Sequence, residues 1–353
     1  MKLAISLHEI NCQSGTGRAA IFMTKGLNHM NEASPNVLLT GATGFIGGRL
    51  LRKLASKGIL VRCLVRSAKR FPGKIPCGIE PQVMEGDLLQ PDTLGRAMEG
   101  IDTAYYLVHS MGGRSMFQYK AYLDKDVQAV RNFTQAADES GVKRIIYLGG
   151  LGEMADNLSE HLKSRQMVAQ VLQSARARTT VLRAANIIGA GGAPFEMLRH
   201  LVERLPVMVC PRWIETRCQP IAVENVIEYL TGCLLEPKTA GKTLDIGGTE
   251  IITYRQLMTK YARIRGLRRM IFTVPILTPH LSSYWINFVT TVPAGVVMPL
   301  VEGLKNEVVC KNDEIRELIP IRLVSMDEAI RMALSEMAQG SESIVSCQSC
   351  LRT

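Results

Sequence analysis

Three glycines, Gly41, Gly44 and Gly47, have the spacing that indicates chemistry most directly in this chain. They lie in the run VLLTGATGFIGGRLL of residues 37–51, between a short apolar segment and the start of an amphipathic one. Glycines with this spacing let the backbone turn sharply, let a pyrophosphate approach it and let the following helix pack on the strand. The N-terminus of that helix offers N–H groups and a partial positive charge to an anion. The pattern therefore predicts a phosphate-binding turn.

The residues after this turn indicate which ligand carries the phosphate. Residues 58–66, GILVRCLVR, form a second predicted strand directly after the helix and complete a β-α-β unit. A dinucleotide-binding turn requires this context, and a tight turn in an ordinary α/β protein is the alternative interpretation. We expect the dinucleotide to contact the turn residues Gly41, Thr43, Gly44, Phe45, Ile46 and Gly47.

The end of the second strand distinguishes between the two nicotinamide dinucleotides. An acidic residue there binds both ribose hydroxyls of NAD, whereas a basic residue suits the 2′-phosphate of NADP. This chain has Arg66 there, followed by Ser67, Lys69 and Arg70. NADP(H) is therefore favoured over NAD(H), and the alternative is a basic loop that only faces solvent.

Alternating strands and helices continue beyond this unit and must position the other functional residues. Strands are predicted over 81–89, 102–110, 143–152 and 179–191, with helices over 93–98, 116–137 and 159–175. Short crossovers and strongly apolar strands predict a doubly wound parallel sheet, a Rossmann fold of the α/β class. Ligands of such sheets lie at the carboxyl ends of the strands, which here carry Asp87, Leu88, His109, Ser110, Gly149, Gly150 and Asn186. Of these, Asp87, Leu88, His109 and Gly149 are expected to contact the cofactor.

Composition limits the other functions that the chain could have. Its hydrophobic fraction of 46% is enough for a large core, and its formal net charge of +10 suits an anionic cofactor, a membrane surface or nucleic acid. No helix-turn-helix or zinc-finger spacing is present and aromatic residues are few, so nucleic acid is not expected. Nine cysteines without a framework indicate a reducing compartment. Cys347 and Cys350 are interpreted as free thiols, and no metal site is expected.

The predicted organisation has four parts. Residues 1–34 are expected to be a disordered extension or an over-long start, and they carry no secretory signal. Residues 35–250 form the dinucleotide-binding domain, 251–335 a smaller apolar C-terminal segment on the substrate side, and 336–353 a flexible tail. We expect a cytoplasmic protein.

The C-terminal segment contains a long uncharged stretch. Residues 270–301 include no Lys, Arg, Asp or Glu, and Pro275, Pro279, Pro293 and Pro299 interrupt them. These prolines argue against a membrane-spanning helix. Two interpretations remain: a buried wall of an apolar substrate pocket, which is favoured, and a peripheral surface that rests on a membrane with the preceding arginines at the lipid headgroups.

Several motifs in order along the chain resemble one protein superfamily. GATGFIGG, GDL, YYLVHSMGG, RIIYLGGLG, LRAANIIG, QPIAVENV and TLDIGG lie within residues 37–309. Together they resemble the short-chain dehydrogenase/reductase superfamily, in particular its atypical NmrA-like and extended members and a bacterial subgroup of undefined substrate. The resemblance implies an NAD(P)H-binding Rossmann domain and an oxidoreductase or isomerase that acts on a small molecule.

The residues that transfer protons in that superfamily are exchanged in this chain. Its hydride-transferring members use a Tyr-x-x-x-Lys pair on the helix after the fifth strand, and none of the nine tyrosines here has a lysine four positions later. The corresponding helix has His161 and Arg165, which share a helix face. Gly149 and Gly150 stand where a serine is usual, and Asp126 replaces an asparagine.

These exchanges leave two functions open. A histidine titrates near neutral pH, so His161 is a candidate general acid or base, with Arg165 either holding the ribose or lowering the pKa of that histidine. We therefore expect the catalytic residues to be His161, Arg165 and Asp126. The favoured function is an NADP(H)-dependent oxidoreductase or isomerase acting on a hydrophobic small molecule. The alternative is a non-catalytic NAD(P)H-sensing regulator, or an accessory or assembly subunit.

Overall fold

The computed structural model describes residues 36–71, 80–109, 116–152, 158–274 and 300–350, without the side chains of 70, 116–123, 160 and 340–350. The predicted extension 1–34, Ser110 and residues 275–299 of the uncharged stretch lie outside the described residues, as do the thiols of Cys347 and Cys350. Residues 36–353 form one compact unit.

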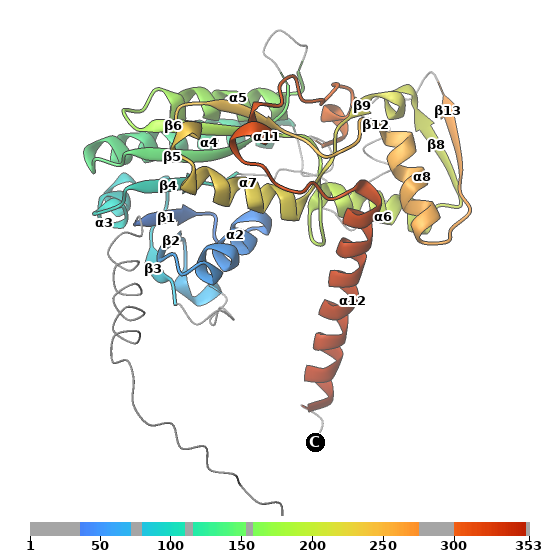
Figure 1. Ribbon diagram of the computed structural model, residues 1–353, viewed down its shortest axis with the longest axis horizontal. Helices are drawn as coiled ribbons and strands as arrows, with labels where there is room; N and C mark the ends of the chain where they lie inside the picture. The colour runs from blue at the N-terminus through green and yellow to red at the C-terminus, as the bar shows by residue number, and fades with distance from the viewer. Residues whose placement is uncertain (1–35, 72–79, 110–115, 153–157, 275–299, 351–353) are drawn as a thin grey trace, which may run out of the picture. The chain divides into compact units, whose positions relative to one another are not determined.

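A seven-stranded parallel sheet forms the centre of this unit (Figure 1). Its strand order is β11-β6-β5-β4-β1-β2-β3, and every pairing in it is parallel. The direction in which the chain adds strands reverses between β1 and β4, so the carboxyl ends of these two strands border a ligand crevice. The predicted doubly wound Rossmann sheet is confirmed. Its strands are β1 (Val37–Thr40), β2 (Val61–Val65), β3 (Gln82–Glu85), β4 (Thr103–Tyr106), β5 (Arg144–Gly150), β6 (Arg178–Ala184) and β11 (Thr243–Ile246).

Helices cover both faces of the sheet, as Figure 1 shows. One face packs in a core with α2 and α7, and the other face packs with α3, α4 and α5. These helices are α2 (Phe45–Ser56), α3 (Leu94–Met98), α4 (Met116–Glu139), α5 (Glu160–Gln173) and α7 (Val223–Leu235), with the short turns η1 (Ala68–Arg70), η2 (Pro91–Thr93) and η4 (Pro237–Thr239).

Neighbouring residues of β4 show why both faces need cover. Tyr105 points into the first core and donates a hydrogen bond to the Leu230 carbonyl of α7 at 2.8 Å. Tyr106 points into the second core, where its ring meets the ring of Phe133 edge to face, with centroids 4.9 Å apart. Successive side chains of a strand point to opposite faces of the sheet. Because both tyrosines are fully buried, both faces must be covered.

A third core is built by the C-terminal part of the chain together with the region after β6. It draws on residues from both sides of position 250, and the rings of Phe195 and Tyr261 meet in it at 6.0 Å. The predicted boundary at 250 therefore does not separate two cores, and the predicted tail from 336 begins inside a helix. The elements here are α6 (Ala193–Arg204), α8 (Tyr254–Ile264), α12 (Met326–Cys350), η3 (Arg212–Glu215) and the strand pairs β7 (Ile187–Ile188) with β10 (Ile221–Ala222), β8 (Val207–Pro211) with β13 (Met270–Val274), and β9 (Arg217–Cys218) with β12 (Ile252–Thr253). The short helix α11 (Glu314–Leu318) packs in the core of α2 and α7 instead.

The two described ends of the uncharged stretch differ in burial. At its start, Met270 and Phe272 are more than half exposed, whereas at its end Val301 and Leu304 are buried. The buried end agrees with the favoured interpretation and the exposed end does not. Across the described ranges, no helix combines the length and the hydropathy needed to cross a bilayer.

Arg183 and Asp245 connect the last two strands of the sheet. They are direct neighbours in the register of β6 and β11, and Arg183 Nε donates to Asp245 Oδ1 at 2.7 Å. The backbone N–H of Lys311 donates to Asp245 Oδ2 at 2.9 Å. The Asp245 side chain is fully buried, so it depends on the guanidinium to replace the hydration that it has lost.

We expect Arg183→Met to lower the free energy of unfolding by about 3–5 kcal/mol, because it leaves the buried Asp245 carboxylate without its cation. Chemical denaturation followed by circular dichroism measures the loss. Lys143→Met is the matched control, because its ion pair with Asp102 is exposed on both sides and such pairs contribute less than about 1 kcal/mol. Equal losses in the two variants would contradict this assignment.

Candidate functional site

The glycine turn between β1 and α2 is built from backbone contacts that exclude side chains. Gly41 has a φ of +75°, and a Cβ on it would lie 2.6 Å from the carbonyl oxygen of Leu107. A Cβ on Gly47 would lie 2.1 Å from the Gly41 carbonyl oxygen, so α2 starts in direct contact with the turn. A Cβ on Gly44 would lie 3.2 Å from that oxygen, and Gly44 borders a cavity. Of these three glycines, Gly44 thus has the most space around it on the protein side, and it faces the cavity.

The N-terminus of α2 has the features that a pyrophosphate needs. Gly44 is its N-cap and provides no side-chain hydrogen bond, and the first turn contains no acidic residue. The first N–H groups of the helix therefore remain available to an anion, and the helix dipole attracts one. These residues fit the pyrophosphate of a dinucleotide.

A cavity of about 470 Å³ lies beside this turn, within the size range of small-molecule sites. The glycine turn and the carboxyl ends of β5 and β6 contribute to its lining, and so do α5, α6 and the region before α11. Most of the lining side chains are apolar. They include Phe45, Ile46, Leu107, Leu148, Leu162, Met197, Leu300, Leu304 and Val308.

Three of the polar side chains that line this cavity cluster with a fourth, that of Asp126. His109 follows β4, and its Nδ1 lies 3.2 Å from Oδ2 of Asp126 on α4. The rings of His109 and His161 have centroids 5.0 Å apart, and His161 and Arg165 both line the cavity from α5. Among the described residues, the buried Nε2 of His109 has no hydrogen-bond partner. The tertiary structure thus brings Asp126, His109, His161 and Arg165 together as one polar cluster at a cavity whose lining is mostly apolar.

Burial keeps both histidines of this cluster neutral. Burial, followed by the charge of Arg165, lowers the pKa of His109, while the hydrogen bond and charge of Asp126 oppose the shift, and the net pKa is about 4. Burial, followed by Arg165 and His109, also holds the pKa of His161 well below its usual value. Both imidazoles are therefore uncharged at neutral pH and each has one ring nitrogen that can accept a hydrogen bond. Because neutral His109 donates its Nδ1 proton to Asp126, its Nε2 keeps a free lone pair.

The other predicted cofactor residues lie around the glycine turn and after β2 and β3. Thr43 is exposed in the turn and Arg66 is exposed directly after β2. The Asp87 carboxylate accepts a hydrogen bond from the N–H of Leu89 at 3.0 Å and so closes a turn. Leu88 is buried, and its carbonyl accepts a hydrogen bond from Asn132 Nδ2 at 2.8 Å. The contacts of these four residues with a cofactor stay predictions.

Tyr254 is a cavity residue that the sequence patterns did not single out. It begins α8, lines the cavity and forms a side-chain hydrogen bond with Asn186, and burial raises its pKa well above the usual value. Leu300 and Leu304 also line the cavity. The sequence predicted that the C-terminal segment lies at the pocket, but it did not identify these two residues. No local pattern marks these residues, because their contacts join segments far apart in the chain.

Residues 41–188 match a protein-family model described as NAD(P)H-binding. This range contains the glycine turn and the whole polar cluster. The chain carries an NAD(P)H-binding domain. The predicted dinucleotide binding is confirmed, and the homologues of this NAD(P)H-binding domain lie in the extended and atypical short-chain dehydrogenase/reductase family, as the sequence motifs indicate.

Three relatives show the range of this family. The chain is 30% identical over 132 residues to the 3 beta-hydroxysteroid dehydrogenase/Delta 5→4-isomerase of Mycobacterium tuberculosis, and the match spans 34% of each chain, about a third of that enzyme. It is 26% identical to the ceramide reductase of Caulobacter vibrioides, over 69% of this chain and 75% of the relative. It is also 23% identical to the mitochondrial NADH dehydrogenase (ubiquinone) 1 alpha subcomplex subunit 9 of Arabidopsis thaliana, over 70% of this chain and 63% of the relative.

A solved structure shares the fold of most of this chain. The triphenylmethane reductase of Citrobacter sp., complexed with NADP(H), superposes with a TM-score of 0.65 over 84% of this chain and 99% of the other. The two sequences are 19% identical, so the likeness concerns the fold.

We expect Gly44→Val to abolish NAD(P)H binding and to keep the fold, because the added side chain occupies the space of the pyrophosphate. Gly48→Ala is the control: its Cβ would lie 3.4 Å from the Ala42 carbonyl oxygen, an ordinary contact, so binding should persist. Gly47→Ala should disturb the turn itself. Titration calorimetry, with thermal unfolding to check the fold, compares the variants. If Gly44→Val binds the cofactor as the parent does, the phosphate site is assigned wrongly.

Proposed function

We propose that this protein is an NADP(H)-dependent oxidoreductase that interconverts an alcohol and a carbonyl group on a hydrophobic small molecule. The observation that supports this most is the position of His161 and Arg165. They lie four residues apart on α5, the helix after the fifth strand, and both line the cavity that the glycine turn also borders.

The lining of the cavity supports a hydrophobic substrate. Apolar side chains from the sheet, α6 and the C-terminal part surround the polar cluster. Two relatives are named for hydrophobic substrates, a hydroxysteroid and a ceramide. An apolar lining with few convergent polar groups binds such molecules by burial and orients them through the polar groups. We therefore place the reacting oxygen of the substrate beside His161.

His161 acts in this proposal as the acceptor of the hydroxyl proton during alcohol oxidation. Its imidazole is neutral, because burial and the charge of Arg165 keep its pKa low, so it can take up a proton without first losing one. A nicotinamide bound beside the glycine turn would supply the hydride chemistry that converts the alcohol to the carbonyl compound and back. Arg165 stays charged and offers a planar set of donors to the ribose hydroxyls.

His109 and Asp126 support the transfer of the proton to His161. Asp126 orients the His109 ring through Nδ1, and Nε2, which has no partner among the residues that the structure describes, can accept a hydrogen bond. The ring of His109 lies beside that of His161. We propose that His109 either contacts the cofactor, as the sequence predicts, or holds a water molecule that passes the proton from His161 onward.

The alternative function is an NAD(P)H-binding regulator or accessory subunit without turnover. One relative is a subunit of mitochondrial NADH dehydrogenase, and this chain lacks the Tyr-x-x-x-Lys pair. A sensor would bind the two oxidation states of the cofactor differently and change its conformation. Different protease sensitivity with NADPH and NADP⁺, in the absence of any substrate turnover, would favour this function.

His161→Ala should lower turnover by about 10²–10⁴-fold with little change in cofactor affinity, since it removes the proton acceptor. The assay screens lipophilic secondary alcohols with NADP⁺, and quinones, enones and carbonyl compounds with NADPH. Tyr254→Phe is the matched control, because it removes a hydroxyl donor from the cavity with little change of side-chain volume. Full activity in His161→Ala, with loss of activity in Tyr254→Phe, would transfer the role to the tyrosine.

The pH profile gives a second readout of the same step. Because the pKa of His161 lies well below its usual value, the imidazole stays neutral as the pH falls from 8 through about 6.5, and the rate of alcohol oxidation should fall only at lower pH. Arg165→Met removes a charge that lowers this pKa, so the acid limb should move to higher pH. If the acid limb of the Arg165→Met profile does not move, the proposed effect of the Arg165 charge on the pKa of His161 is wrong.

Arg66→Ala should weaken NADP(H) binding selectively. Charge-assisted hydrogen bonds to a 2′-phosphate contribute roughly 1.5–3 kcal/mol, which corresponds to a loss of about 10–150-fold. NAD(H) affinity should stay the same, and Arg52→Ala, at an exposed position of α2, should change neither. Titration calorimetry measures both cofactors, and equal affinity of the wild-type protein for NADP(H) and NAD(H) would refute the preference.

A further inference from the structure

The paired strands β8 and β13 present an apolar face to solvent. Val207 is 42% and Val209 is 47% exposed on β8, and Met270 is 57% and Phe272 is 53% exposed on β13. The register pairs Val207 with Met270 and Val209 with Phe272, so the four side chains lie on the same face. The alternating residues Met208 and Cys210 are buried in the third core. We call the four exposed side chains, with the flanking Arg212 and Arg268, the β8–β13 surface.

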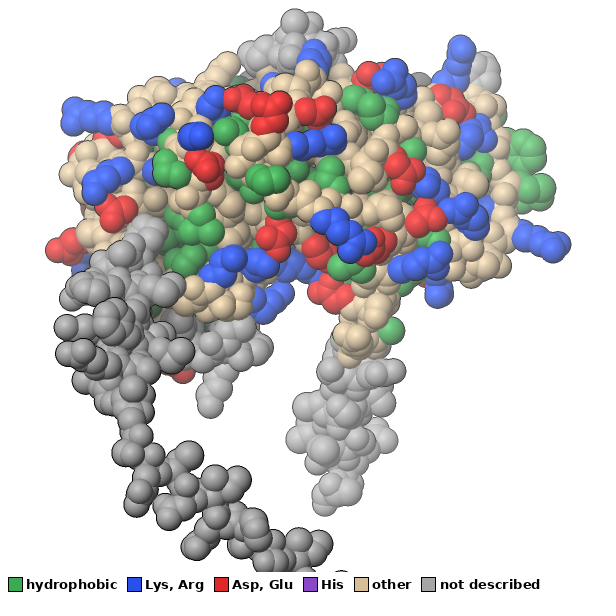
Figure 2. Space-filling view, viewed as in Figure 1, with side chains coloured by type: hydrophobic (Ala, Val, Ile, Leu, Met, Phe, Trp, Pro, Cys, Tyr) green, Lys and Arg blue, Asp and Glu red, His purple; other side chains and the backbone are tan. Residues whose placement is uncertain are grey.

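Arginines surround this apolar face. Residues 203–215 and 263–272, which contain both strands except the end of β13, include six arginines and two glutamates and no other charged residue. Figure 2 shows hydrophobic side chains at the right edge of the molecule, where Figure 1 places β8 and β13, with Lys and Arg side chains around them. The surface therefore combines exposed apolar area with an excess of positive charge.

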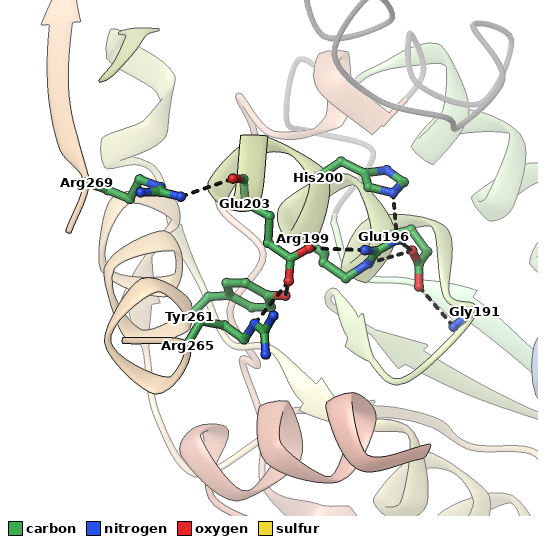
Figure 3. A network of polar contacts seen from close by, with 8 residues as sticks. All are labelled: Gly191, Glu196, Arg199, His200, Glu203, Tyr261, Arg265 and Arg269. Atoms are coloured by element: carbon green, nitrogen blue, oxygen red, sulfur yellow. Dashed lines mark hydrogen bonds and ion pairs between the residues drawn. The ribbon is translucent and has the colours of Figure 1, made fainter. Parts of the chain in front are cut away.

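Both glutamates of this region are already neutralised by other residues. Glu203 accepts hydrogen bonds from Tyr261, Arg265 and Arg199, as Figure 3 shows. Glu215 pairs with Arg255. Within the described part of the chain, Arg212 and Arg268 form no ion pair, and both are exposed. The charges that remain uncompensated next to the apolar face are thus positive.

Hydrogen bonds hold the strand pair firmly against the third core. Arg269, directly before β13, donates to the carbonyls of Val202 and Glu203 at the end of α6. Arg255 of α8 donates to the carbonyl of Ile271 in β13 at 2.8 Å. The apolar face is therefore a fixed part of the fold, and its exposure does not result from a loosely attached segment.

We propose that the β8–β13 surface docks on a lipid bilayer that contains anionic lipids. Apolar side chains that enter the interface, with arginines at the headgroups, are the two contributions that bind peripheral proteins to such membranes. A second copy of this chain is a poorer occupant, because four half-exposed side chains provide far less than the roughly 800 Å² per partner that stable protein interfaces bury. The proposal concerns a surface outside the cofactor cavity and does not depend on the proposed activity.

Sedimentation of the full chain with lipid vesicles tests this inference without cofactor or substrate. We expect binding to vesicles of phosphatidylcholine with phosphatidylglycerol, much weaker binding to phosphatidylcholine alone, and partial release at high salt, because salt screens the arginines. The double variant Val209→Ser/Phe272→Ser should lose on the order of tenfold in affinity, since it removes apolar area from the interface. Arg212→Gln/Arg268→Gln should lose on the order of tenfold at low salt and little at high salt.

Two matched variants control for general changes in hydrophobicity and charge. Leu235→Ser removes a side chain that is 57% exposed at the end of α7, and Arg96→Gln removes an exposed arginine on α3. Both should bind vesicles as the wild type does. Thermal unfolding checks the fold of each variant. If Val209→Ser/Phe272→Ser does not fold, Arg212→Gln/Arg268→Gln still tests the proposal.

Three outcomes would overturn the proposal. They are absence of binding to anionic vesicles, equal losses in the control and surface variants, and loss of a dimer in analytical ultracentrifugation with unchanged vesicle binding. The last result would assign the surface to self-association. None of these outcomes bears on NADP(H) binding or turnover, so failure here is distinguishable from failure of the proposed oxidoreductase activity.

Discussion

The close contact between Gly47 and the Gly41 carbonyl is the constraint on which the rest of the site depends. Because no side chain fits between these residues, α2 begins directly above the end of β1 and directs its first N–H groups toward the crevice. The backbone of Gly41 also lies against Leu107 at the end of β4. His109, two residues further on, is thereby held at the same crevice. One backbone packing requirement thus places the anion site and the first residue of the polar cluster together.

The polar cluster shows how a change of residue type can preserve an electrostatic design. In the family that the motifs resemble, a lysine lowers the pKa of a tyrosine, whose ordinary value is near 10. In this chain the cation is Arg165 and its neighbour is His161, whose ordinary pKa is near 6.5. In both cases the nearby cation lowers the pKa of its neighbour, but the ordinary pKa of a histidine is lower than that of a tyrosine. The result is an imidazole that is neutral at neutral pH.

Two helices of the third core, α6 and α8, connect the cavity with the β8–β13 surface. The N-terminal turn of α6 contributes Pro194 and Met197 to the cavity, and β8 follows its C-terminus. The first residue of α8, Tyr254, lines the cavity, and β13 follows that helix. A helix of 12 residues such as α6 is about 18 Å long. A protein docked through this surface would therefore hold the cavity at a fixed, short distance from the lipid in which hydrophobic molecules dissolve.

The sequence by itself determined the features that depend on neighbours along the chain. The glycine turn, the alternation of strands and helices, the doubly wound sheet and the shared helix face of His161 and Arg165 all follow from local spacing and periodicity. Only the tertiary structure decided that Asp126 orients His109, that Tyr254 and Leu304 line the cavity, and that Met270 and Phe272 are exposed. These properties arise from packing between distant segments. An uncharged stretch has the same composition whether it faces a core or solvent, so only the fold distinguishes its buried end from its exposed one.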